Sequence, residues 1–279
     1  MQDYAPKAFN LYIPSNSGIK KAIKKGLFKI NNETAKTGSW VVSGQTIDLI
    51  ENETNKPKVY EFNLPIVFED ESIAIINKPA GITVSGNQFK TIYNALPFNL
   101  TKSTEIDALS WPTPVHRLDN QTSGILVIAK TKTAQIELDK QFKNKTIQKT
   151  YSTLVIGEVT QNEDISTPIE GKLSTTKFEI NEVTNSLKFG KLSFLKVYPK
   201  TGRTHQIRIH MASIGHPILG DKLYGTAEAL HKGKGLFLNA TEIEFFHPKT
   251  QKKVHYKIDV PNKFITLINR EIDRFINAN

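Results

Sequence analysis

The sequence predicts an α+β fold in which helices flank a central mixed sheet, preceded by a small module. Short apolar runs bounded by turn residues recur along the chain, and two stretches between them carry apolar residues at helical spacing. With 279 residues and 38% apolar composition, the chain is long enough for one large domain with a sizeable core and a small appendage.

The N-terminal part is expected to consist of a tail over residues 1–12 and a compact module over residues 13–56. Capping and turn residues set the boundaries of the elements expected in this module. These elements are, in order, a helix over 15–26 with Ser15 or Ser17 as its N-cap and Gly26 as its end, a turn at Asn31 and Asn32, and a strand over 46–50.

The helix of the module carries a cluster of lysines on its exposed side, namely Lys20, Lys21, Lys24 and Lys25. Residues 1–60 contain nine lysines and five acidic residues, a balance of 9 − 5 = +4. A run of charge is usually a solvated helix face, but it is also the composition of a surface that binds RNA phosphates. The composition leaves both interpretations open.

A polar linker is expected over residues 52–57, followed by the larger domain over residues 60–279. Five runs of this domain have strand character, and two segments have helical spacing. The expected strands cover 72–77, 125–129, 151–156, 192–198 and 241–246, and the expected helices cover 134–142 and 205–214.

Composition narrows the class of protein. A formal charge of +10 and a pI near 9.5 give the chain a field that attracts polyanions, among which nucleic acid is the commonest partner. The absence of cysteine excludes disulfides, thiolate nucleophiles and cysteine-based metal sites. Because no secretory signal is visible and no apolar run approaches the roughly 20 residues of a membrane span, a cytoplasmic protein is expected.

The first candidate for chemistry is Asp119, within a polar stretch over 116–124 that leads directly into the apolar run starting at Ile125. This sequence places a carboxylate at the mouth of a strand, where a rigid scaffold can present a reactive group. An aspartate in such a stretch also commonly forms an Asx-turn and nothing more. The spacing alone leaves both roles open.

The second candidate segment covers 201–217, where Ile207, Met211 and Ile214 form an apolar helical stripe. Arg208 lies beside that stripe, so packing of the helix would bring its guanidinium to the edge of the core. A guanidinium in that position needs an acidic partner, whereas an exposed arginine would need none. Arginine is otherwise scarce, because only five of the 37 basic residues are Arg.

Several motifs together resemble the RluA family of pseudouridine synthases. In chain order they are INKPAGI at 76–82, HRLD at 116–119, TSGILVIAKT at 122–131, KTYSTLV at 149–155, GRTHQIRIHM at 202–211 and GHPILGDKLYG at 215–225. The N-terminal helix, turn and strand with GQTIDLI similarly resemble the S4 RNA-binding fold that precedes many RluA-type catalytic domains.

This resemblance implies a largely antiparallel central sheet with flanking helices and a catalytic cleft, plus a small S4-like α/β module. The implied reaction is isomerisation of a uridine within structured RNA, ribosomal or transfer RNA, without cofactor or metal. The N1–C1′ bond breaks, the base turns within the site, and C5 joins C1′. No membrane and no obligate protein partner are implied, and a monomer is expected.

The resemblance also implies roles for single residues. Asp119 would be the essential carboxylate, acting either as nucleophile or as base, with Arg208 as its charge partner. Tyr151 would stack on the target uracil and help to remove the C5 proton. Arg117 would fill the gap left by the extruded nucleotide. Supporting positions are His116, Ile207, Arg203, Asn120, Thr122 and Gly124.

Three other interpretations also fit parts of the sequence. A noncatalytic RNA-binding protein would need only the basic surface, and the joint presence of Asp119, Tyr151 and Arg208 argues against it. A metal site on His205 and His210 is disfavoured, because i, i+5 spacing puts them on different helix faces. A β-lactamase-like serine enzyme is the third. Its short motifs occur here in order, as Ser17-x-x-Lys20, Ser85-x-Asn87 and Lys200-Thr201-Gly202, but such an enzyme needs an export signal, and none is visible in this sequence.

Overall fold

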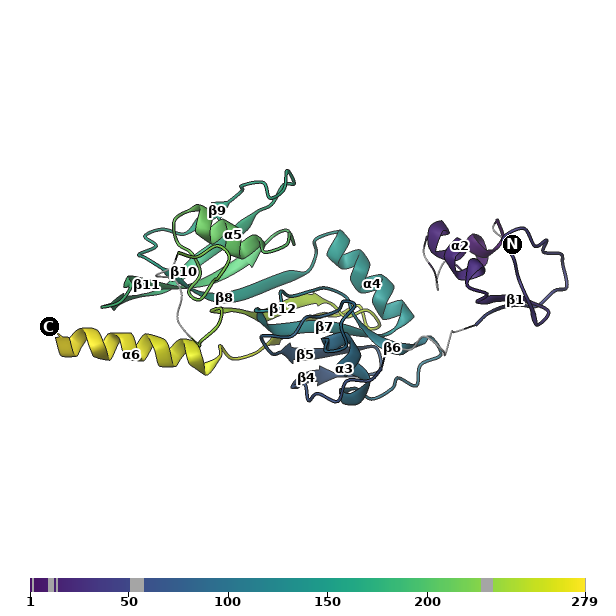
Figure 1. Ribbon diagram of the computed structural model, residues 1–279, viewed down its shortest axis with the longest axis horizontal. Coiled ribbons are helices and arrows are strands. Elements are labelled where there is room, and N and C mark those ends of the chain that lie inside the picture. The colour runs from purple at the N-terminus through teal and green to yellow at the C-terminus, as the bar shows by residue number, and fades with distance from the viewer. Residues whose placement is uncertain (2, 10–12, 14, 51–57, 227–232, 279) are drawn as a thin grey trace. The chain divides into compact units, whose positions relative to one another are not determined.

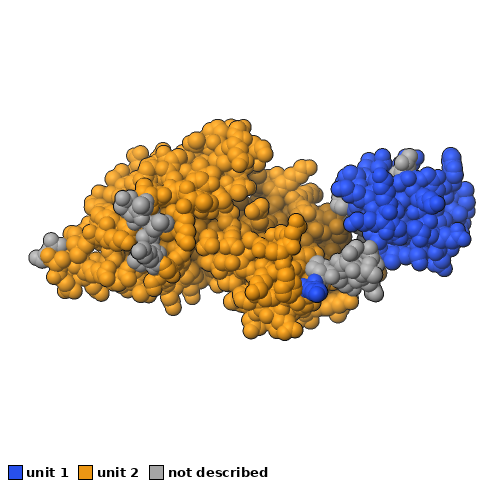
Figure 2. All heavy atoms as spheres, in the orientation of Figure 1, with its two compact units in different colours: residues 1–58 blue, residues 59–279 orange. Residues whose placement is uncertain are grey.

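The computed structural model divides the chain into two compact units, residues 1–58 and residues 59–279 (Figures 1 and 2). The residues that it describes are 1, 3–9, 13, 15–50, 58–226 and 233–278. The expected linker over 52–57 lies outside these described residues. No described helix is both long and apolar enough to cross a membrane.

The described residues of the first unit form two helices and a small antiparallel sheet in the order β2-β1-β3. Its elements are α1 (Ala5–Ala8), α2 (Asn16–Lys24), β1 (Phe28–Ile30), β2 (Glu33–Thr34) and β3 (Ile47–Leu49). Ser15 is the cap of α2, because its side chain accepts a hydrogen bond from the backbone N–H of Gly18. Asn31 and Asn32 both adopt positive φ, as a two-residue hairpin loop requires.

The core of this unit includes the start of the chain. Met1 and Ala5 are buried in one cluster with Ile19, Ile23 and Phe28. The described part of the expected N-terminal tail therefore packs on the module as α1 and its flanking residues. This packing was not visible in the sequence, because the segment is too short to show a helical period.

The second unit is built on one ten-stranded sheet. Its strands are β4 (Ile66–Glu69), β5 (Ile73–Lys78), β6 (Ala108–Pro114), β7 (Ser123–Thr131), β8 (Gln148–Ile156), β9 (Glu163–Ile165), β10 (Thr176–Ser186), β11 (Gly190–Pro199), β12 (Leu238–Phe246) and β13 (Lys253–Lys257). Its helices are α3 (Ile92–Asn99), α4 (Lys132–Lys143), α5 (Gln206–Ser213) and α6 (Asn262–Ala278).

The sheet is mixed and largely antiparallel, which confirms the predicted fold class. Its main path runs β4-β5-β7-β12-β8-β11-β10-β9, with β6 paired to β7 and β13 to β12. The pair β7–β12 is parallel, and the other strand pairs of this sheet are antiparallel. Four of the five strands expected in this domain lie within β7, β8, β11 and β12, and the fifth, expected over 72–77, overlaps β5 with a shift of one residue.

The strands β5 and β7 have apolar residues at consecutive positions because both faces of the sheet are covered there. Successive side chains of a strand point to opposite faces. On one face, Ile73, Ile75, Ile125, Val127 and Ala129 pack with Ala134 and Leu138 of α4. On the other, Ala74, Ile76, Leu126 and Ile128 pack with Ile92, Ala95 and Leu96 of α3. Figure 1 shows both helices beside this part of the sheet.

Candidate active site

The second unit contains a cavity of about 450 Å³ where three segments of the chain meet. The segment between β6 and β7 forms one wall, β8 forms the floor with Tyr151, and the segment from Pro199 through α5 forms the other wall. Eight of the candidate residues line it: His116, Arg117, Asp119, Thr122, Tyr151, Arg203, Ile207 and Arg208. The fold thus gathers these residues from three distant parts of the sequence.

Asp119 lies in the turn that enters β7, and its backbone carbonyl accepts a hydrogen bond from the N–H of Thr122. Two residues further along, Gly124 adopts φ +118° at the parallel contact with β12. A Cβ at Gly124 would lie 2.3 Å from the carbonyl oxygen of Ala240, so only glycine allows this approach. The Thr122 hydroxyl is buried without a hydrogen-bond partner among the described residues.

The far side of the Asp119 turn is held by Lys78. Its ammonium donates to the carbonyl of Pro79 at 2.8 Å and to that of Asn120 at 3.3 Å. Burial lowers the pKa of Lys78 to about 8, although the nearby Asp119 charge opposes this shift. Lys78, from the INKPAGI motif, therefore stabilises the turn through its hydrogen bond to the Asn120 carbonyl.

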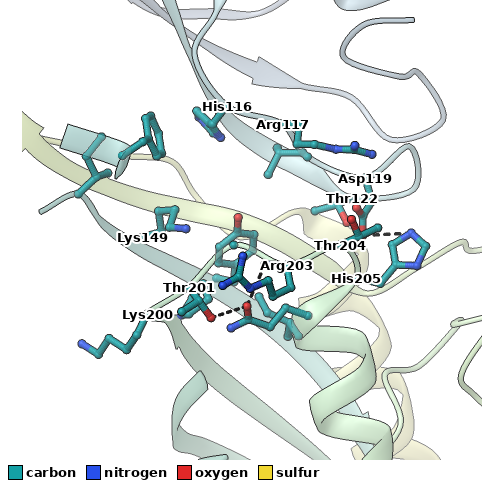
Figure 3. Close-up of a pocket in the computed structure, with 18 of the residues that line it drawn as sticks. His116, Arg117, Asp119, Thr122, Lys149, Lys200, Thr201, Arg203, Thr204 and His205 are labelled. Carbon is teal, nitrogen blue, oxygen red and sulfur yellow. Dashed lines mark hydrogen bonds and ion pairs between the residues drawn. The ribbon is translucent and has the colours of Figure 1, made fainter. Parts of the chain in front are cut away.

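Two cationic or ionisable groups face the Asp119 carboxylate. The Nη1 atom of Arg208 lies 3.7 Å from Oδ2, and the Nε2 atom of His205 lies 3.8 Å from the same oxygen. Figure 3 shows Asp119 and His205 turned toward each other. His205 holds this place in a left-handed backbone conformation, φ 56°, at the start of α5.

Arg208 makes its closest ion pair with Asp221 and not with Asp119. Its Nε and Nη2 atoms donate to the two oxygens of Asp221 at 2.8 and 2.7 Å, a bidentate pair in which both side chains are buried. Burial opposes both charges, but the mutual hydrogen bonds and attraction lower the pKa of Asp221 and raise that of Arg208. The expected pairing with Asp119 is thus the longer of two contacts.

Tyr224 belongs to the same turn as Asp221 and contacts the other neighbour of Asp119. Its hydroxyl lies 3.0 Å from Nδ1 of His205, and its ring centre lies 5.2 Å from the Arg208 guanidinium carbon. The turn therefore holds both groups that face Asp119, Arg208 through Asp221 and His205 through Tyr224. The motif GDKLYG was noticed in the sequence, but nothing in the pattern assigned these contacts.

Tyr151 lines the cavity floor on β8. Burial, aided by the negative charge of Asp119, raises the pKa of its hydroxyl well above the usual range. The phenol therefore stays protonated at neutral pH. In this form Tyr151 is better suited to stack on a base than to accept a proton as a phenolate. Ile207 presents an apolar side chain to the same cavity.

The charge of the cavity wall is strongly positive. Seven lining residues are cationic, namely Arg117, Lys143, Lys145, Lys149, Lys200, Arg203 and Arg208, whereas Asp119 is the one acidic residue among the lining residues. Arg117 is exposed, and its guanidinium makes no hydrogen bond or ion pair with the described residues. Its guanidinium is therefore available to a polyanionic ligand.

Other candidates lie elsewhere. Lys20, Lys21, Lys24 and Lys25 are exposed on or beside α2 in the first unit. His210 is buried against Ser174 and Thr176, away from His205, as the helical spacing predicted. Within the described ranges, no three His, Asp or Glu side chains gather as a metal site requires.

Comparison with known proteins shows the family to which the chain belongs. The sequence model of the RNA pseudouridylate synthase family matches residues 72–213. A relative from Aquifex aeolicus, described as an uncharacterized RNA pseudouridine synthase, is 35% identical over 278 residues and covers 90% of this chain and 87% of its own. Ribosomal large subunit pseudouridine synthase D of Nitrosomonas europaea is 31% identical, covering 91% of this chain and 79% of its own.

The fold is shared with a solved structure, human RNA pseudouridylate synthase domain containing 1. The TM-score is 0.58 at 22% identity, covering 74% of this chain and 95% of that one. The family match includes the Asp119 turn, Tyr151 and Arg208, which the structure brings to one cavity. From its sequence, its fold and the matched segment, the chain belongs to the RNA pseudouridylate synthase family and is an RNA-modifying isomerase.

Proposed function

We propose that this enzyme converts a uridine of ribosomal RNA to pseudouridine, with Asp119 as the essential carboxylate. The observation that carries the proposal is that Asp119 is the one carboxylate among the residues that line the cavity, whereas seven of those residues are cationic. A basic wall attracts the RNA backbone, and the isolated acid remains as the group that can react with the sugar or the base. The noncatalytic RNA-binding alternative leaves this carboxylate without a use.

The side chains around Asp119 support distinct roles in the reaction. Arg208 and His205 orient the carboxylate, and Tyr151 offers an aromatic face against which the uracil can stack. The N1–C1′ bond breaks, the base turns, C5 bonds to C1′, and the C5 proton is lost while N1 gains one. Asp119 serves as nucleophile or base in this sequence.

Access to a stacked uridine requires its extrusion from the RNA. The exposed, unpaired guanidinium of Arg117 stands at the cavity beside Asp119 and is suited to fill the space that the uridine leaves. Arg203 lies on the opposite wall, where its guanidinium donates to the carbonyl of Leu173. These two arginines would then contact RNA and take no part in bond making.

Ribosomal RNA is the favoured substrate because relatives from several bacteria are named for the large ribosomal subunit. Transfer RNA is the second candidate substrate. Mapping of pseudouridine in total RNA from cells with and without the gene distinguishes the two. A modification lost from large-subunit RNA supports the proposal, and one lost from transfer RNA alone contradicts that choice of substrate.

The role of Asp119 is tested with the Asp119→Asn variant on the RNA identified in that way. The amide has nearly the same volume but no charge, so pseudouridine formation should be abolished, while the melting temperature stays close to that of the wild type. RNA affinity should not fall, because a carboxylate makes no attractive contact with phosphates. Substantial product from the folded variant would refute the assignment.

A further inference from the structure

Lys149 differs from the other lysines that the described structure removes from water. Lys78 donates to backbone carbonyls, Lys130 pairs with Glu69 at 2.6 Å, and Lys263 donates to the carbonyl of Leu236 at 2.6 Å. Lys149 is half-buried, yet its ammonium has no hydrogen bond or ion pair with any described residue. It is a desolvated cation without a counter-charge.

Burial of this ammonium is unfavourable in the free protein. Desolvation lowers the pKa of Lys149. Burial is the main cause that lowers the pKa of His116 to about 3, and the charge of Lys149 adds to that shift. The side chain of His116 cannot compensate the charge, because its Nε2 atom accepts a hydrogen bond from the backbone of Val127. An unpaired cation in such a place indicates an anion that arrives with the substrate.

The position of Lys149 relative to Tyr151 indicates which anion. Both residues lie on β8 two positions apart, so their side chains share one face of the strand, about 7 Å apart along it. Both line the cavity, and Figure 3 shows the Lys149 side chain turned into it. A nucleotide whose base stacks on Tyr151 would have its backbone within reach of Lys149.

The opposite wall leaves room for a ligand at this point. The Nζ atom of Lys149 lies 4.0 Å from where a Cβ on Gly202 would be placed, so the ammonium faces bare backbone there. Lys200 and Arg203 flank this glycine and line the same cavity. The three cations thus surround a space without a described acidic residue.

We propose that Lys149 binds a phosphodiester of the RNA strand next to the uridine that stacks on Tyr151. The proposal rests on the proposed function, because it takes Tyr151 as the surface under the target base. Phosphate is the anion that RNA provides, and the compact ammonium of lysine binds it as a point charge. The phosphodiester of the substrate supplies the counter-charge that Lys149 lacks in the free protein.

The test uses the full-length protein and unmodified, in vitro transcribed large-subunit ribosomal RNA labelled with tritium at uridine C5. Wild type is compared with Lys149→Met, Lys149→Arg and Lys143→Met. Lys143 is a matched control, because it lines the same cavity but is exposed at the end of α4. The readouts are tritium release, which gives kcat and KM, RNA affinity at several KCl concentrations, and the melting temperature.

We expect Lys149→Met to weaken RNA affinity roughly 10- to 100-fold, the effect of losing a charge-assisted hydrogen bond in a desolvated site. KM should rise more than kcat falls, and the slope of log K against log salt should lose about 0.7 to 0.9. Because an unpaired, half-buried charge is removed, the melting temperature should stay equal or increase. Lys149→Arg should retain most of the affinity, and Lys143→Met should lose less than Lys149→Met.

Two results would overturn the proposal. Equal losses in Lys149→Met and Lys143→Met would mean that Lys149 contributes only to the general field of the cavity. A lower melting temperature with an unchanged salt slope would assign Lys149 a structural role. If the wild type releases no tritium from this RNA, the choice of substrate fails, while the salt slope still tests whether Lys149 contacts a phosphate.

Discussion

At the scale of single residues, the organisation of the site rests on a buried carboxylate that does not line the cavity. Asp221 is fully buried, accepts two hydrogen bonds from Arg208, and accepts two more from the backbone N–H groups of Leu223 and Tyr224. This arrangement fixes the guanidinium so that Nη1 remains directed at Asp119. Asp221 is therefore a positioning residue for Asp119.

The first prediction at this scale concerns the coupling of Arg208 to its two acids. Arg208→Met strands the buried Asp221, so it should cost about 3–5 kcal/mol of folding stability. Adding Asp221→Asn removes the stranded charge and should restore part of that loss. Adding Asp119→Asn instead should restore little, because Asp119 is only partly buried and its contact with Arg208 is longer.

Chemical denaturation of the two double-mutant cycles measures both couplings. A coupling energy between Arg208 and Asp119 as large as that between Arg208 and Asp221 would contradict the structure. Asp221→Asn alone should also lower kcat more than it raises KM, because a misdirected Arg208 no longer orients Asp119. An unchanged kcat would mean that Asp221 serves stability alone.

At the scale of elements, the site depends on the contact between the parallel strands β7 and β12. Gly124 lies at this contact, directly after the turn that contains Asp119, and pairs with Ala240. The Asn239 side chain donates to the hydroxyl of Ser123 at 2.7 Å across the same pair. The strand contact thus fixes the entry of β7 and with it the turn that presents Asp119.

Gly124→Ala should be strongly destabilising. Its Cβ would collide with the backbone oxygen of Ala240, which no side-chain rotation relieves, so a loss on the order of 3 kcal/mol or more is expected. Gly171→Ala is the matched control, because Gly171 also has positive φ, +70°, but has open space around it. The control should cost about 1 kcal/mol from backbone conformation alone. Similar losses in urea denaturation would show that β7 and β12 can separate.

At the scale of the whole molecule, positive charge is found in both units. The cavity of the second unit concentrates cations around one carboxylate, whereas the first unit carries exposed lysines on a small helix. The resemblance of the first unit to an S4 domain remains a prediction. Its lysines would add sequence-independent affinity through phosphates, and they leave the chemistry to the second unit.

Replacing the lysines at 20, 21, 24 and 25 together by glutamine tests this division. All four are exposed, so the fold should be unaffected, and the formal charge falls from +10 to +6 by 10 − 4. If each contacts a phosphate, the slope of log K against log salt should fall by about 0.7 to 0.9 per lysine, while kcat at saturating RNA stays constant. An unchanged slope in a filter-binding titration would identify the lysines as a solvated surface.

The sequence by itself predicted the class of fold, which the structure confirms, and the segments that meet at the cavity. Alternating and continuous apolar runs fixed the strands, because burial on one or both faces leaves a direct trace in the order of residues. The motif around Asp119 was recognisable because a turn and a following strand are local in the chain. Tyr151 and Arg208 were found through the family resemblance, since neither has a local pattern that distinguishes it from a core residue.

Only the tertiary structure decided which side chains act on one another. Asp221 as the main partner of Arg208, Tyr224 as the partner of His205 and the unpaired state of Lys149 depend on contacts between segments that the sequence does not order in space. The same holds for Gly124. This position must be glycine because a Cβ would collide with the backbone of Ala240, in a strand more than a hundred residues further along the chain. Local patterns encode secondary structure and burial, whereas pairing of buried charges is decided by how the packed elements meet.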